Sequence, residues 1–224
     1  MDPDFWHRRW RKSEIAFHQR EINTHLQQFW NRLALKPNER IFVPLCGKSL
    51  DMLWLAGQGY QVLGVEISPL AVESFFQENG LNPQIQRTER FEIWQADAFT
   101  LLLGDFFALV PADLSDIASA YDRASLIALP PAMRQQYARH LTAILPPSAS
   151  VLLVTLEYPQ EAMQGPPFSV EEPEVQALYE NAYDIERLYV HDALAENPRF
   201  HDRLSRLEEK VYLLKPKAAS VDLP

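Results

Sequence analysis

The sequence predicts an α/β protein with a Rossmann-like, mostly parallel sheet and helices on both faces. Between residues 40 and 157, apolar segments of strand length alternate with segments of helical pattern. The first strand runs into a turn at Pro44 to Gly47, a helix follows, and the second strand ends in the carboxylate of Glu66. Strands that alternate with helices are joined by crossover connections, which favour a parallel sheet.

Apolar periodicity and proline or glycine punctuation predict the other elements in order. The first thirty-odd residues have helical spacing, which ends at Lys36-Pro37-Asn38-Glu39, and Ser68-Pro69 supplies an N-cap and a first-turn proline. The sequence predicts helices at about 49–58, 69–79, 131–144 and 173–180, and strands at 40–45, 61–67, 91–96, 115–121, 151–156, 185–190 and 210–214. The last two strands alternate enough to form an antiparallel pair.

The chain is expected to form a single domain. A length of 224 residues with 47% apolar content is enough for one sizeable core. Within it we expect a helical N-terminal lid at 1–35, a cofactor-binding core at 40–157, a proline-rich substrate loop with the terminal strand pair at 158–214, and a tail at 215–224.

Composition excludes several classes of partner. A formal charge of −9 counts against broad nucleic-acid binding, and the basic run at residues 7–12 is the one local exception. Cys46 is the only cysteine, so neither an intramolecular disulfide nor a cysteine-rich metal site can form. There is no apolar run near 18 residues and no basic-then-apolar signal pattern. We therefore expect a cytoplasmic protein with no membrane or nucleic-acid partner, and a monomer is the default expectation.

The turn after the first strand indicates the cofactor. Glu66 lies nineteen residues after Gly47, close to the separation at which an acid reaches a bound ribose. A dinucleotide needs three glycines near its pyrophosphate, whereas here Pro44 and Leu45 obstruct that approach and only Gly47 fits the role. A cofactor with adenosine but no phosphates tolerates this turn. S-adenosylmethionine (SAM) is the common one.

Several strand-end residues are candidates for holding SAM. Glu66 can accept hydrogen bonds from both ribose hydroxyls, and the alternative is a solvated acid that caps the next helix, a role for which Ser68 is better placed. Asp97, or the backbone of Ala98, ends the 91–96 strand and is a candidate for the adenine amine, with a plain turn as the alternative. Leu45 offers main-chain groups and an apolar wall for the sulfonium methyl.

Arg123 follows the fourth strand, where its guanidinium can reach a methionine carboxylate or an anionic substrate. An ion pair with Asp122 or a nearby glutamate is the alternative. Cys46 adjoins the turn without a nearby histidine in sequence, so a structural role is favoured over a nucleophilic one. The six histidines have no metal-ligand spacing, and there is no Gly-x-Ser-x-Gly elbow.

Five motifs resemble one known family. They are Trp6-x-x-x-Trp10 with Ala16-Phe17-His18-Gln19, Val43-Pro-Leu-Cys-Gly-Lys-Ser-Leu-Asp51, Gly64-Val-Glu66, Tyr121-Asp-Arg123 and Gly165-Pro-Pro-Phe168. In this order they resemble thiopurine S-methyltransferase in its bacterial form, over about residues 5 to 214. The Pro-Leu-Cys-Gly-Lys-Ser segment is far more specific than a generic glycine-rich loop.

The resemblance implies a seven-stranded SAM-methyltransferase sheet with one antiparallel strand near its C-terminal edge. It implies methylation of aromatic and heterocyclic thiols, with selenium and tellurium compounds as alternative acceptors, and so a role in detoxification or metalloid resistance. The cofactor contacts of the family match Trp10, Leu45, Glu66 and Arg123. Phe17 would close over the site and contact substrate, and an arginine late in the chain, for which Arg199 is the nearest candidate, would approach the substrate with Arg123.

A thiol acceptor explains the absence of a clear catalytic base, because aromatic thiols ionise readily near neutral pH, and no metal is required. Trp10 and Phe17 are seven residues apart, so on a continuous helix both would face the cofactor. Three alternatives remain open: a nicotinamide oxidoreductase, a non-catalytic SAM-binding module, and a methyltransferase for an oxygen, nitrogen or metalloid acceptor.

Overall fold

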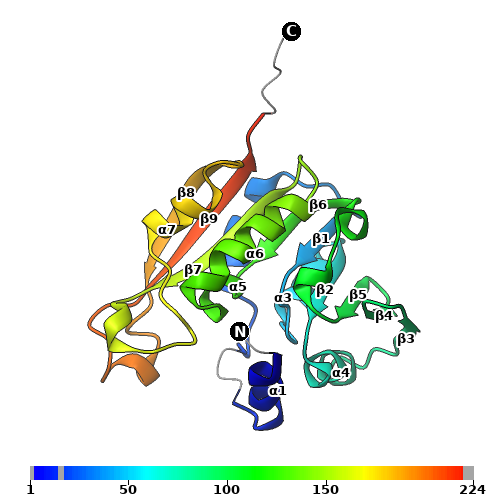
Figure 1. The fold of residues 1–224 in the computed structure, drawn as a ribbon, viewed down its shortest axis with the longest axis horizontal. Coiled ribbons are helices and arrows are strands. Elements are labelled where there is room, and N and C mark those ends of the chain that lie inside the picture. Colours follow the sequence, from blue (N-terminus) through cyan, green and yellow to red (C-terminus); the bar gives the residue numbers. More distant parts are fainter. Residues whose placement is uncertain (1–2, 15–17, 219–224) are drawn as a thin grey trace.

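A computed structural model describes residues 3–14 and 18–218 of the 224-residue chain. Nine strands form one sheet in the order β3-β4-β5-β2-β1-β6-β7-β9-β8 (Figure 1). The strands are β1 Arg40–Val43, β2 Gln61–Glu66, β3 Gln84–Arg87, β4 Glu92–Ala96, β5 Phe99–Leu103, β6 Ile117–Asp122, β7 Ser150–Glu157, β8 Tyr183–Asp192 and β9 Glu208–Pro216.

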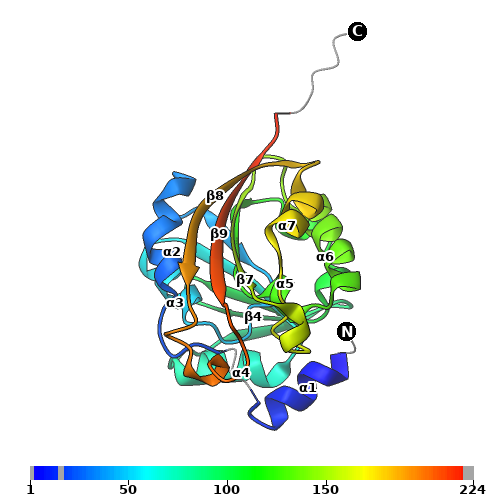
Figure 2. The same cartoon turned by 90° about the vertical axis from the view of Figure 1, so that its left-hand side faces the viewer.

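Helices cover the sheet and one of its ends. The α-helices are α1 Pro3–Arg11, α2 Thr24–Phe29, α3 Asp51–Gly57, α4 Pro69–Glu78, α5 Ser125–Ala128, α6 Pro131–Ile144 and α7 Glu172–Tyr179. Short 3-10 helices are η1 Trp30–Leu33, η2 Phe106–Ala108, η3 Pro111–Leu114, η4 Gln160–Ala162 and η5 Pro198–Phe200. Figure 2 shows α2 and α3 on one side of the sheet and α6 and α7 on the other.

The centre of the sheet confirms the predicted fold class. Strands β5, β2, β1, β6 and β7 are mutually parallel, and β9 is antiparallel to both β7 and β8. The seven strands from β5 to β8 therefore contain one antiparallel strand next to the C-terminal edge, as expected. The count of seven is wrong for the whole sheet, because β4 and β3 add two antiparallel strands beyond β5. The last strand also continues through Lys215 to Pro216.

The β4–β5 hairpin was not expected. The predicted strand at 91–96 is β4, but it runs antiparallel to β5, and β5 is the strand that lies parallel to β2. The two strands are joined by a tight turn at Asp97 and Ala98, in which Asp97 has φ +50°. Aspartate tolerates this left-handed conformation better than most residues, which suits a two-residue hairpin turn.

The core lies in two layers because successive strand residues point to opposite faces. Phe42 of β1 packs with α6 and α7, whereas its neighbours Ile41 and Val43 pack with α2, α3 and α4. Most side chains of both layers are fully buried. Both faces of β1 are therefore apolar, and its chemistry is confined to its ends.

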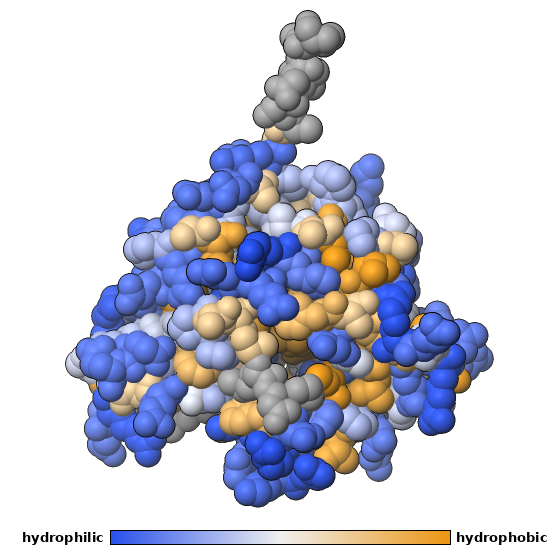
Figure 3. Space-filling model, viewed as in Figure 1, coloured by the Kyte–Doolittle hydropathy of each residue, from blue (hydrophilic) through white to orange (hydrophobic). Residues whose placement is uncertain are grey.

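The N-terminal helix α1 lies at the end of the sheet where the parallel strands finish, opposite the end at which β9 finishes (Figure 1). It packs on α4 and ends at Arg11. The prediction of a continuous helix from Trp10 to Phe17 is therefore wrong, and Phe17 itself lies outside the described residues. Figure 3 shows polar side chains over α1 and apolar surface gathered above it in the same view.

Candidate active site

Three chain segments meet at the carboxyl edge of the parallel strands. β1 pairs with β2 on one side and with β6 on the other, with Val43 opposite Gly64 and Phe42 opposite Ala120. The turn after β1, the end of β2 at Glu66 and the end of β6 therefore lie side by side. In open α/β sheets ligands bind outside this edge.

The turn after β1 has an unusual backbone. Leu45 has φ +47° and Gly47 has φ +54°, a left-handed region that glycine adopts freely and leucine rarely. The Cys46 N–H donates to the Val65 carbonyl at 3.0 Å, which fastens the turn to β2. A strained non-glycine residue at a strand end is typical of a ligand site, and Leu45 is half-buried at this edge.

Cys46 has a structural role in this turn. Its thiol is buried, and burial first, then the Glu66 charge, raises the pKa of Cys46 well above its ordinary value. A Cβ atom on Gly64 would lie 2.7 Å from Cys46 Sγ, so Gly64 makes room for the thiol. A protonated thiol with no free space around it is a poor nucleophile.

Glu66 is buried, with 6% of its surface exposed, and is not the solvated acid of the alternative interpretation. Its Oε2 accepts the Gly47 N–H at 2.9 Å and its Oε1 accepts the Ser68 N–H at 2.8 Å. Ser68 makes no side-chain cap of its own. Burial raises the pKa of Glu66, although its backbone hydrogen bonds act in the other direction. Each carboxylate oxygen keeps a further lone pair for a ligand hydroxyl.

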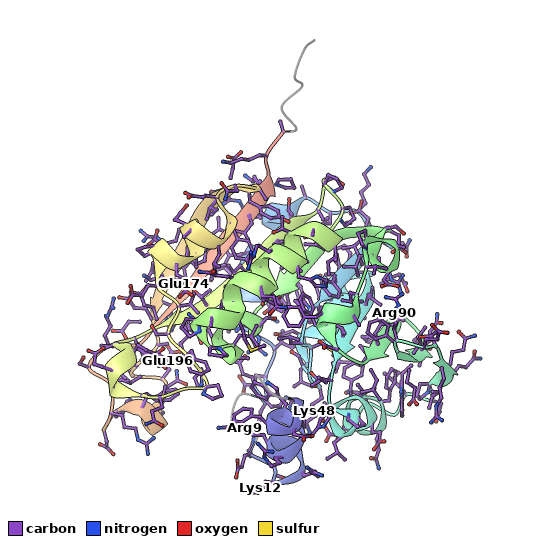
Figure 4. The ribbon with its side chains drawn as sticks, viewed as in Figure 1. Arg9, Lys12, Lys48, Arg90, Glu174 and Glu196 are labelled. Carbon is purple, nitrogen blue, oxygen red and sulfur yellow. The ribbon has the colours of Figure 1, made fainter. Side chains whose placement is uncertain are left out.

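Helix α1 covers this turn. A Cβ atom on Gly47 would lie 3.4 Å from Cζ2 of Trp10, so the indole lies directly against the glycine. Trp10 is 8% exposed, and the His7 Nε2 lies 2.9 Å from the Ile67 carbonyl oxygen beside Glu66. Figure 4 shows Lys48 beside α1, with Arg9 on the helix and Lys12 just after its end. Trp10, which was predicted to cover the cofactor, therefore lies over the turn that follows β1.

Arg123 lies at the same edge, and its ion-pair partner is Asp51. Its Nε donates to Asp51 Oδ2 at 2.8 Å, and its Nη2 lies 3.5 Å from Ser49 Oγ. Burial lowers the pKa of Arg123, but the charge and hydrogen bond of Asp51, together with Tyr121 and Glu209, outweigh it, and the net pKa is raised. Its side chain is 16% exposed. A permanently charged guanidinium therefore stands at the edge with part of its surface accessible.

Asp122, the predicted alternative partner of Arg123, is engaged elsewhere. It accepts the Tyr137 hydroxyl at 2.7 Å and the Ser125 N–H at 3.2 Å. Burial raises the pKa of Asp122 above its usual range. Successive side chains of β6 point to opposite faces, so Asp122 faces α6 while Tyr121 and Arg123 point toward Asp51.

Ala98 is not at this edge, which corrects the prediction. Its carbonyl accepts the Val62 N–H at 2.8 Å, near the amino end of β2. The reason is the hairpin, which returns the chain to the opposite edge before β5 begins. The segment that comes beside Glu66 is the end of β5, where the Gly104 N–H donates to the Glu66 carbonyl at 2.9 Å. Asp105 follows as the N-cap of η2.

Two predicted substrate residues have side chains outside the described part of the chain. Phe17 and the side chain of Arg199 lie outside the described part of the structure, and only the backbone of Arg199 is placed, in η5. The Gly165-Pro-Pro-Phe168 loop is fastened next to β7. The Phe168 N–H donates to the Ile127 carbonyl at 2.7 Å, and the Tyr158 hydroxyl donates to the Pro167 carbonyl at 2.6 Å.

The comparisons with known proteins decide the family. Residues 1–217 match the family model described as thiopurine S-methyltransferase. The chain belongs to the thiopurine S-methyltransferase family. This confirms the resemblance inferred from the Pro-Leu-Cys-Gly-Lys-Ser segment and the motifs around it.

Relatives match over nearly their full length. The thiopurine S-methyltransferase of Nitrosospira multiformis is 52% identical over 220 residues, which are 98% of this chain and 100% of that protein. A thiopurine S-methyltransferase of Pseudomonas fluorescens is 50% identical over 216 residues, 96% of this chain and 99% of the relative.

Solved structures share the fold of this family member. A SAM-dependent methyltransferase from Geobacter sulfurreducens in complex with S-adenosylhomocysteine has a TM-score of 0.63 at 16% identity and covers 95% of this chain and 98% of its own. The 1,6-didemethyltoxoflavin-N1-methyltransferase of Burkholderia thailandensis has a TM-score of 0.64 at 13% identity, with 96% and 87% covered. At such low identities, both support the fold alone.

Sequence reasoning missed two residues of the site. Asp51, which binds Arg123, was read only as part of a motif. His18 was read only as part of a motif and as a histidine without metal-ligand spacing. Burial first, then the Lys48 and Arg123 charges, lower the pKa of His18, while Glu78 and Asp51 oppose this. A carboxylate in the first turn of the helix after the cofactor turn was the one available signal for Asp51.

Two absences hold for the described residues. No group of three or more histidine, cysteine, aspartate or glutamate side chains in residues 3–14 and 18–218 is arranged to hold a metal ion. None of the helices in the same ranges combines the length and the hydropathy needed to cross a membrane.

Proposed function

We propose that this protein transfers the methyl group of SAM to the sulfur of aromatic and heterocyclic thiols, thiopurines among them, and releases S-adenosylhomocysteine. Membership of the thiopurine S-methyltransferase family supports the reaction class. The observation that carries the proposal is the buried Glu66 carboxylate, fixed by two backbone N–H groups at the carboxyl edge of β2. A buried acid anchored at that edge suits a ribose.

The residues at this edge fit SAM better than a dinucleotide. Glu66 would accept the ribose hydroxyls, and the Arg123 guanidinium would hold the methionine carboxylate. The main chain of Leu45 and Gly47 would contact the amino-acid part. By its position beside Glu66, the segment that starts at Gly104 replaces Ala98 as the candidate for the adenine.

When bound there, SAM supplies a methyl group activated by its sulfonium charge. The protein would orient the acceptor sulfur and keep water away. The Trp10 side chain, which lies against Gly47, would contribute to excluding water. An aromatic thiol is already partly ionised near neutral pH, so no general base is required, and Arg123 would favour the thiolate. In-line orientation of a bound pair can contribute several kcal/mol, up to about 7–11 in the best models.

The Gly165-Pro-Pro-Phe168 loop supports an acceptor pocket over a non-catalytic SAM-binding module. Its hydrogen bonds to Ile127 and Tyr158 hold it beside the carboxyl end of β7. We assign this loop, together with Phe17, Arg123 and Arg199, to the acceptor side. The acceptor is then a small molecule. We also propose that the protein is a monomer in the cytoplasm, and sedimentation of the purified chain tests its oligomeric state.

Labelled methyl transfer tests the proposed function. Purified protein with methyl-labelled SAM should methylate thiophenol and thiopurines. Calorimetry should detect binding of SAM and S-adenosylhomocysteine but no binding of NAD or NADP. Selenite and tellurite in the same screen test the alternative acceptors. Methyl transfer to these compounds alone would show that the acceptors are metalloids. Tight NAD binding with no binding of SAM would favour an oxidoreductase.

A further inference from the structure

Asp51 is a buried carboxylate that connects three segments of the chain at the cofactor edge. It is 1% exposed and starts α3. Its Oδ1 accepts the Asn23 N–H at 2.8 Å. Its Oδ2 accepts the Tyr121 hydroxyl at 3.1 Å and the Arg123 Nε–H at 2.8 Å. Both oxygens are therefore occupied by donors from outside its own helix.

A carboxylate in this place must offset the cost of removing its charge from water. Three donors and the first turn of a helix, whose dipole favours a negative charge, together do so. The arrangement is asymmetric for Arg123. Its Nε is committed to Asp51, while its Nη2 lies 3.5 Å from Ser49 Oγ and 16% of the side chain stays exposed. The direction of the guanidinium is thus set by Asp51 before any ligand arrives.

The Asn23 contact adds a second consequence. Asn23 caps α2, because its side-chain oxygen accepts the N–H groups of His25 and Leu26. Through Oδ1 of Asp51, the start of α2 is held to the same carboxylate that holds Arg123. The position of the segment that enters α2 and the direction of the guanidinium therefore depend on a single side chain.

We propose that Asp51 is a positioning residue for the cofactor site, which aims the Arg123 guanidinium at the ligand carboxylate and ties the start of α2 to that arrangement. The inference rests on the proposed function, because it takes SAM or S-adenosylhomocysteine as the ligand. Asp51 does not touch the ligand in this role. Its effect on the ligand runs through Arg123, which makes the proposal open to a double-mutant test.

The test is a thermodynamic cycle for S-adenosylhomocysteine binding by calorimetry, with Asp51→Asn, Arg123→Gln and the double variant. Asp51→Asn should weaken binding by about 10- to 100-fold, the range for a lost charged hydrogen bond. In the Arg123→Gln background the same substitution should add less than about twofold, because coupled residues are not additive. Asp51→Glu, which keeps the charge, should recover part of the affinity.

Asp122→Asn is the matched control. Asp122 is as buried as Asp51 and precedes Arg123 directly, but its partners are Tyr137 and Ser125. This variant should change the melting temperature and leave the affinity for S-adenosylhomocysteine within about twofold, since it removes a buried charge without touching Arg123.

A measurement on the unsubstituted protein covers the case in which Asp51→Asn does not fold. The Arg123 Nε–H proton, assigned by comparison with Arg123→Lys, should exchange slowly with solvent both before and after S-adenosylhomocysteine is added. Fast exchange in both states, or full additivity in the cycle, would overturn the positioning role. Failure of the unsubstituted protein to bind SAM would instead refute the proposed function.

Discussion

The two ends of the parallel sheet differ in what they bury. At the carboxyl edge, Asp51, Glu66 and Arg123 are charged groups with little exposure, held by fixed hydrogen bonds. At the amino edge, a cavity of about 580 Å³ is lined mainly by apolar and small side chains, among them Ala143, Pro146 and Tyr183. A second cavity of about 440 Å³ lies over one sheet face, with Arg90 and Asp113 paired to each other at its wall.

Cavity volume alone therefore does not identify the candidate site. A buried charge costs free energy unless it is paired, so a chain that maintains several at one edge is expected to use them. The apolar cavity at the amino edge has no such free-energy cost of buried charge. The position of Arg90 far from Lys48 and α1 in Figure 4 illustrates the separation between the wall of the sheet-face cavity and the cofactor edge.

The largest expected effect is that of Glu66→Gln. The amide has one acceptor oxygen where the carboxylate has two. Binding of S-adenosylhomocysteine should therefore weaken by roughly 1–3 kcal/mol in a folded protein, as measured by calorimetry. Glu73→Gln, an exposed glutamate of α4, is the matched control and should bind as before. Equal affinity in both variants would remove Glu66 from the site and break the comparison between the edges.

A pH dependence should follow from the same residue. Burial raises the pKa of Glu66 above its ordinary value of 4.5. The protein without ligand therefore loses stability as the pH rises from 4.5 through this raised pKa. Ribose hydroxyls favour the ionised form. Affinity for S-adenosylhomocysteine should therefore fall as pH drops below the raised pKa, by up to about tenfold per unit. Glu66→Gln should lack this slope, and a slope unchanged in the variant would assign it to another group.

Trp10→Ala tests the cover over the edge and should have a moderate effect. Loss of the indole against Gly47 should raise the dissociation constant of S-adenosylhomocysteine about fivefold, near 1 kcal/mol of lost apolar contact. Hydrogen exchange in α1 should slow when the ligand binds. Trp94→Ala on β4 removes an indole that stacks on Phe76 and should leave the affinity unchanged. If α1 instead responded to anionic vesicles or DNA, its basic face would be the functional one.

Filling the amino-edge cavity should have the smallest effect. Ala143→Leu places a larger apolar side chain at its lining, and we expect methyl transfer and ligand affinity within about twofold of the unsubstituted protein, because the cavity is at the far end of the sheet. A larger loss in a variant with unchanged melting temperature would show that the two ends communicate.

Local signals predicted much of the fold. Helix α6 has the predicted bounds, 131–144, because prolines at 130–131 and 146–147 restrict the backbone whatever surrounds it. Local signals likewise predicted the turn from Pro44 to Gly47 and the acid that ends β2. The β4–β5 hairpin was not predicted, since its apolar residues follow Asp97 without a glycine and its direction depends on the partner strand.

The sequence by itself determined the family, the central parallel strands and the carboxylate at Glu66, because each is encoded by residue types at short fixed spacings. Tertiary structure alone decided that Ala98 lies at the wrong edge and that Arg123 pairs with Asp51 and not with its neighbour Asp122. Those outcomes depend on which strands lie side by side and on which face each side chain points to. The energies that select them are contacts between segments far apart in the chain, which spacing does not record.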